Sequence, residues 1–217
     1  MLSRTPRRAV TRTAALTLAA LTLTACAASP GGAPAVVSTR SSDSPYKGVT
    51  LNGSDRVPNV ALKDTSGRTY DPATHAKNRL TLLFFGYTHC PDICPTTLAD
   101  LSGALRALPA RTRRKINVLF VGVDTKRDTP KAMRSFLDHF DKAFVGLTGN
   151  PSKIRKAATD AHVFFQVPKN ATGNYAVSHS AEVRVYGPDG RARLLFTAGT
   201  QDTDIAHDLR LLGKDLR

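Results

Sequence analysis

The chain has 217 residues, 41% of them hydrophobic, and its 31 lysines and arginines outnumber its 17 aspartates and glutamates, which gives a formal charge of +14. This length suits a single domain with flanking segments and is enough to bury a sizeable core. So basic a chain could bind nucleic acid, but it contains no nucleic-acid-binding motif, and we expect no nucleic-acid partner. Attraction to anionic headgroups, attraction to an acidic protein and a basic surface without a partner all stay open.

The first 25 residues are typical of an export signal. Their arginines lie at positions 4, 7, 8 and 12, ahead of a short apolar run at 14–25, and no acidic residue occurs among them. A run of this length is too short to span a bilayer, which takes about 20 residues. An exported protein does not meet nucleic acid, which is a second reason to expect no nucleic-acid partner.

The leader closes with Leu23-Thr24-Ala25-Cys26, which resembles a bacterial lipobox. The resemblance implies that Cys26 is lipidated and becomes the N-terminus of a protein anchored to the cell membrane, facing the extracytoplasmic side. Two acyl chains hold a protein stably on a membrane, whereas one gives only marginal binding. A cleaved secretory signal with an incidental cysteine is the alternative, and the twin-arginine and general secretory routes both stay open.

The stretch 26–54 is rich in proline, glycine, serine and alanine and has few large apolar residues. Such a segment cannot bury enough surface to offset the entropy that it loses on ordering, so we predict a flexible tether there. From 55 to 217 the hydrophobic pattern is dense, which predicts one folded domain.

Within this domain, apolar strands alternate with amphipathic helices, which predicts an α/β fold. Prolines at 95, 130 and 151 stand at expected helix starts, and residues 187–190 (Gly-Pro-Asp-Gly) have the chemistry of a hairpin turn. The expected elements are a strand at 79–85, a helix at 95–108, a strand at 116–123, a helix at 130–140, a strand at 144–147, a helix at 151–161, paired strands at 180–186 and 191–196, and a helix at 203–213. This order is typical of an elaborated thioredoxin-like domain, with a central mixed sheet flanked by helices and an added β-hairpin.

Cys90 and Cys94 follow the first predicted strand and precede the first predicted helix. Unpaired backbone N–H groups and the helix dipole favour a thiolate at such a place. Two thiols this close in sequence can form a redox couple, hold a soft metal ion, or close a structural disulfide, since an exported protein meets oxidising conditions.

Three segments resemble motifs of the Sco/SenC family, which assists the assembly of cytochrome c oxidase. Residues 85–95 (Phe-Gly-Tyr-Thr-His-Cys-Pro-Asp-Ile-Cys-Pro) resemble its copper motif, and 123–130 (Val-Asp-Thr-Lys-Arg-Asp-Thr-Pro) and 175–180 (Tyr-Ala-Val-Ser-His-Ser) resemble two further motifs in the same order. The similarity extends over 57–212. Ser178 stands where many members carry aspartate, so that carboxylate's role does not transfer, and Thr125-Lys126 replaces a commoner Pro-x pair.

The resemblance implies that Cys90, Cys94 and His179 bind copper, as Cu(I), Cu(II) or both. Two thiolates and one imidazole form a soft ligand set that satisfies Cu(I), although zinc would also accept it. The resemblance further implies a metallochaperone whose client is subunit II of cytochrome c oxidase. Because a disulfide would abolish metal binding, a thiol reductant in the same compartment is an expected partner.

An enzyme is the alternative function: a thiol-disulfide reductase that acts through Cys90 and Cys94 and keeps the client's cysteines reduced. His179 discriminates between the two, because metal binding needs it and redox chemistry does not. Asp92 and Asp124 are candidates for residues that contact the metal ligands and orient them. The alternative for Asp92 is a solvent-exposed side chain, and the alternative for Asp124 is hydrogen bonding within its loop. His89 adjoins Cys90, but neighbouring side chains at a strand end point apart, so we expect it to order the loop rather than bind metal.

Overall fold

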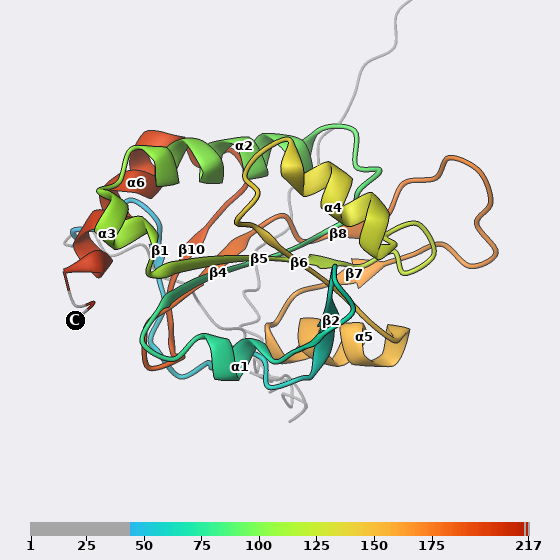
Figure 1. The fold of residues 1–217 in the computed structure, drawn as a ribbon, viewed down its shortest axis with the longest axis horizontal. Helices are drawn as coiled ribbons and strands as arrows, with labels where there is room; N and C mark the ends of the chain where they lie inside the picture. Colours follow the sequence, from blue (N-terminus) through green and yellow to red (C-terminus); the bar gives the residue numbers. More distant parts are fainter. Residues whose placement is uncertain (1–43, 215, 217) are drawn as a thin grey trace, which may run out of the picture. The chain divides into compact units, whose positions relative to one another are not determined.

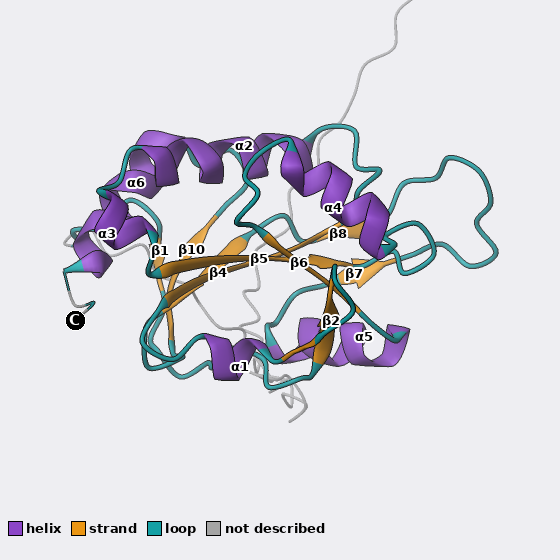
Figure 2. Ribbon diagram, viewed as in Figure 1, coloured by secondary structure: helices purple, strands orange, loops and turns teal. Residues whose placement is uncertain are grey.

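An eight-stranded mixed sheet forms the centre of the fold (Figures 1 and 2). The computed structural model describes residues 44–214 and 216, and the leader with Cys26 lies outside them. Neighbouring strands across the sheet are β1 (Val49–Thr50), β10 (Ala192–Phe196), β9 (Val183–Tyr186), β4 (Leu80–Gly86), β5 (Ile116–Gly122), β6 (Val145–Thr148), β2 (Leu62–Asp64) and β3 (Thr69–Tyr70). The three central strands β4, β5 and β6 run parallel, and every other pairing is antiparallel.

Helices cover both faces of this sheet (Figure 1). On one side lie α2 (Ile93–Arg106), α4 (Pro130–Asp138) and α6 (Asp202–Gly213), with the short α3 (Ala110–Arg113) after α2, and on the other lie α1 (Pro72–His75) and α5 (Pro151–Asp160). All seven residues of β4 are buried, because both of its faces are covered. This explains why its sequence is a continuous apolar run, and it confirms the predicted central mixed sheet flanked by helices.

The predicted β-hairpin is confirmed, since β9 and β10 pair antiparallel, but its first strand starts at Val183 rather than at residue 180. Ser178 and His179 belong instead to β8 (Ser178–His179), which pairs with β7 (Phe165–Gln166) in a separate two-stranded sheet. Strands of two residues carry no periodicity that a sequence could reveal.

The helix predicted to open at Pro95 begins two residues earlier, at Ile93, and ends at Arg106. Proline is tolerated here because the first four N–H groups of a helix have no intrahelical acceptor. Cys94 therefore lies in the first turn of α2 rather than in the loop before it.

The folded part also begins before residue 55, where we predicted the domain to start. β1 pairs with β10, and the backbone amides of Lys47 and Gly48 donate to the buried carboxylate of Asp208 in α6. Residues 44–54 thus belong to the ordered domain rather than to a tether. Among the described residues, no helix combines the length and the apolar character that crossing a membrane requires.

Candidate metal centre

Cys90 and Cys94 lie at the C-terminal end of β4, where the chain turns into α2. Cys94 is fully buried, Cys90 is 8% exposed, and neither forms a disulfide. The backbone amide of Cys94 donates to the Cys90 sulfur at 3.4 Å. Glycine is required at position 86, the last residue of β4, because a Cβ there would lie 2.8 Å from the Cys94 sulfur and from the Phe120 ring. The close approach of β4 and α2 thus fixes the position of the two cysteines.

His179 reaches the cysteines from β8, 85 residues further along the chain. Its Nε2 lies 3.5 Å from the Cys94 sulfur, and the ligand atoms of Cys90, Cys94 and His179 all lie within 4.8 Å of one another. Its Nδ1 lies 2.9 Å from the carbonyl oxygen of Ser180, which can only accept, so Nδ1 carries a proton, and in the neutral ring the lone pair of Nε2 is available to a metal ion. The Tyr87 ring packs edge-on at 5.7 Å and limits how the imidazole can turn.

The two thiols differ sharply in acidity. A hydrogen bond from the Cys94 side chain, together with the backbone amides of Asp92 and Cys94, lowers the pKa of Cys90 to about 4. The same contact with Cys90, together with burial, raises the pKa of Cys94. At neutral pH the pair therefore holds one proton, on Cys94, and Cys90 is a thiolate.

The turn after β5 holds the cysteine loop through Asp128. One oxygen of this buried carboxylate accepts from the backbone N–H and the hydroxyl of Thr88, each at 2.8 Å, and the other accepts from the amide of Asp124 at 2.9 Å. Thr88 is two residues before Cys90, so Asp128 fixes the loop that carries the first thiol. Burial raises the pKa of Asp128, and the hydrogen bonds from these three donors oppose that rise.

The same turn holds the histidine segment through Asp124 and Arg127. Arg127 pairs with Asp124, donates to the Tyr175 carbonyl oxygen at 2.9 Å and stacks on the Tyr175 ring with its guanidinium carbon 3.5 Å from the centroid. The Tyr175 hydroxyl donates to Asp124 at 3.0 Å. Although burial opposes it, the hydrogen bonds from Tyr175 and Arg127 keep the pKa of Asp124 below its usual value. Tyr175 is four residues before His179, so this cluster limits where the imidazole can lie.

The family model described as SCO1/SenC matches residues 51–213. The chain belongs to the SCO1/SenC family. Its fold is accordingly thioredoxin-like, as predicted, and solved structures agree. ScoI of Bradyrhizobium japonicum with copper bound is 36% identical, with a TM-score of 0.65 over 72% of this chain and 99% of that one. Apo Sco1 of Thermus thermophilus is 34% identical, with a TM-score of 0.70 over 77% and 96%.

A mitochondrial SCO2 homologue from Danio rerio is 36% identical over 131 residues, which are 59% of this chain and 47% of that protein. The chain thus spans about half the length of this relative. The likeness therefore covers only a part of each of the two proteins.

Placed in this SCO1/SenC fold, the predicted site residues divide into two groups. Cys90, Cys94 and His179 come together, whereas His89 is exposed and lies outside the group, with its Nδ1 on the Thr88 hydroxyl. The Asp92 side chain is also exposed and caps nothing; only its backbone amide acts on Cys90. Asp124 is buried but touches Tyr175 and Arg127 rather than a candidate ligand.

Sequence reasoning missed the contact of Asp128 with Thr88 and the part played by Tyr175. Both residues lie within the segments that resemble family motifs, which is the one signal that pointed to them. Their contacts join residues 40 and 51 positions apart, a separation that no local pattern encodes.

The donor set of this SCO1/SenC site fits copper chemically. Two sulfurs and one imidazole nitrogen are soft ligands of the kind that Cu(I) prefers, and the same set can hold Cu(II) with a further weak ligand. One sulfur is already a thiolate, and the imidazole offers its lone pair, so only the Cys94 proton must leave when metal binds.

Proposed function

We propose that the protein is a copper chaperone that binds one copper ion through Cys90, Cys94 and His179. The observation that carries the proposal is the meeting of two thiols with an imidazole whose tautomer is already set by Ser180. A structural neighbour, ScoI of Bradyrhizobium japonicum, holds copper, which supports the same cargo here.

Delivery of the ion requires exchange of ligands with a client. Cys90 and His179 are each reached by solvent while Cys94 is not, so an incoming ligand meets them first. By family resemblance the client is subunit II of cytochrome c oxidase, and one structural neighbour is described as a member of the Sco family of cytochrome c oxidase assembly proteins. An extracytoplasmic thiol reductant would keep the pair ready for metal.

The proposed place of action is the outer surface of the cell membrane, with Cys26 as the lipid anchor. The arginine-led apolar leader and the lipobox-like ending at Cys26 support this. A SCO1/SenC family protein from Bacillus anthracis is likewise described as a lipoprotein.

Thiol-disulfide exchange is the second candidate function. One observation favours it: the pKa of Cys90 is lowered to about 4, and a thiolate is the attacking species in exchange reactions. Thiol-disulfide exchange does not need an imidazole as a metal ligand, whereas copper binding does, which is why we place copper delivery first.

The test replaces His179 by alanine and compares this variant with Cys90→Ser, Cys94→Ser and the matched control His89→Ala. Copper titration of the reduced protein, followed by thiolate-to-copper charge-transfer absorption, should show one ion per chain in the control and severe loss in the other three. In a strain that lacks the protein, His179→Ala should fail to restore copper loading of the oxidase at ordinary copper supply. Rescue by His179→Ala, with failure of the cysteine variants alone, would replace the chaperone by the reductase.

A further inference from the structure

A dense group of cations surrounds α3, at the end of the sheet where β4 and β5 begin. Four of the five residues at 111–115 are arginine or lysine. Arg111, Arg113 and Arg114 are all exposed, and within the described part of the chain none of the three forms an ion pair. Elsewhere in the described chain several arginines pair with a neighbouring aspartate, and these three do not.

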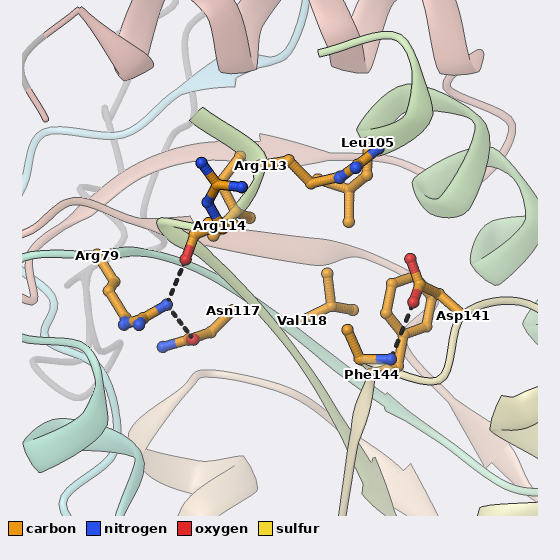
Figure 3. Close-up of a pocket in the computed structure, with 10 residues that line it drawn as sticks. Arg79, Leu105, Arg113, Arg114, Asn117, Val118, Asp141 and Phe144 are labelled. Atoms are coloured by element: carbon orange, nitrogen blue, oxygen red, sulfur yellow. Dashed lines mark hydrogen bonds between the residues drawn. The ribbon is translucent and has the colours of Figure 1, made fainter. Parts of the chain in front are cut away.

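Arg113 and Arg114 border a pocket of about 480 Å³, together with Arg79 (Figure 3). Arg79 donates to the Arg114 carbonyl oxygen at 2.7 Å, which ties its guanidinium to the rim. The pocket also has an apolar lining of buried side chains and one acidic residue, Asp141. The apolar residues are Leu105, Ile116, Val118 and Phe144. A pocket of this size can hold a small organic anion.

A second recess lies beyond α3, between it and the end of α6. Arg111, Lys115 and Lys214 line it together with Leu216, and its volume is about 290 Å³. α3 thus presents cations to two neighbouring hollows, each with at least one apolar wall. A surface that combines cations with apolar recesses suits molecules that join a charged head to an apolar body.

The N-terminal end of the described chain joins the fold close to this surface. The amides of Lys47 and Gly48 bind Asp208, which lies in α6 five residues before Gly213. Gly213 packs against α3, since a Cβ on it would lie 2.8 Å from the Thr112 side chain. The described chain therefore begins beside α6, the helix whose end packs against α3.

The candidate metal centre lies at the opposite end of the same strands (Figure 1). β4 pairs with β5 from Leu80 and Ile116, next to the pocket, to Gly86, next to Cys94. Seven residues of strand span about 20 Å. A surface bound at the α3 end would leave the metal centre pointing away from it.

From these features we propose that the α3 end is a docking surface for the headgroups of anionic phospholipids. The guanidinium groups of Arg113 and Arg114 bind headgroup phosphates, and the apolar lining receives the adjoining glycerol and first methylene groups. The domain then stands on the membrane with the metal centre directed outward, toward a client. This inference draws on the membrane anchoring in the proposed function, but it is tested without the anchor.

The test uses residues 27–217, which lack Cys26 and keep all of the described residues. Its sedimentation is measured with vesicles of phosphatidylcholine alone and with vesicles in which about one third of the lipid is phosphatidylglycerol. We expect binding only to the anionic vesicles, weakening as salt is added.

The decisive variant changes Arg111, Arg113 and Arg114 to glutamine, and its control changes Lys153, Arg155 and Lys156 of α5 to glutamine, which removes the same charge. The first should lose about 100-fold in vesicle affinity, since each cation near an anionic surface contributes about fivefold, and the control should lose less than about fivefold. Equal loss in both, or equal binding to neutral vesicles, would overturn the proposal. Both variants should keep full copper binding, so failure here is distinguishable from failure of the proposed function.

Discussion

The candidate metal centre has two halves, a core half formed by the two cysteines and a histidine half formed by His179, and different parts of the fold hold them. Cys90 and Cys94 belong to the core: Cys90 lies in the loop after β4, a strand that pairs over its full length with β5, and Cys94 is fully buried in the first turn of α2. His179 belongs to a two-residue strand that pairs only with β7, outside the main sheet. The difference teaches that ligands for one candidate site can come from supports of unequal size. The sulfurs rest on the main sheet and α2, whereas the imidazole rests on one pair of two-residue strands.

The turn at 124–129 joins the two halves although it supplies no candidate ligand. Asp128 holds the cysteine loop, and Asp124 with Arg127 holds the segment that leads to His179. The two halves can therefore be perturbed separately by changes within one turn.

The largest effect is expected where the turn holds the core half. Asp128→Ala removes the acceptor for three donors and leaves buried N–H groups unpaired, so the free energy of unfolding should fall by about 3 kcal/mol. Urea unfolding of the apo protein measures this. The control is Asp138→Ala, which breaks a half-exposed pair with Arg134 and should cost less than about 1 kcal/mol. Equal costs would mean that Asp128 does not support the cysteine loop.

A smaller effect should follow from loosening the histidine half. Lysine at position 127 cannot bind Asp124, bind the Tyr175 carbonyl and stack on its ring together, because it lacks the planar guanidinium. Arg127→Lys should therefore lower copper affinity by about tenfold, with the alkylation rate of Cys90 unchanged. Competition titration measures the affinity, and Arg68→Lys, at another arginine paired with an aspartate, is the control. A parallel change in the alkylation rate would show that the halves are not separable.

The smallest change is expected in the pH dependence of the core half. With its pKa lowered to about 4, Cys90 is already a thiolate throughout the range from pH 6 to 8. Its alkylation rate should change by less than about twofold over that range, whereas an ordinary thiol would gain roughly 80-fold. The rate should fall only as the pH approaches 4, where the thiolate takes up its proton. Mass spectrometry of timed samples, mapped to Cys90, tests this, and a steep rise from pH 6 to 8 would contradict it.

Sequence patterns predicted the core half well and the histidine half poorly. The apolar runs of β4 and β5 are visible because both strand faces are covered, and the prolines at 130 and 151 start α4 and α5 as predicted. β7 and β8 are too short to leave a pattern, so His179 entered only through a motif resemblance. The roles of Asp128 and Tyr175 depend on contacts between distant segments, which folding creates and local sequence does not record.

The contact of Asp208 with Lys47 and Gly48 has a mechanical consequence. Within the described residues, a pull applied at Ser44 is resisted by these two amides and is passed to α6, which packs on α2. The force then enters the layer of helices that covers one face of the main sheet. It bypasses β7 and β8, so a pull from this side would not load the strand that carries His179.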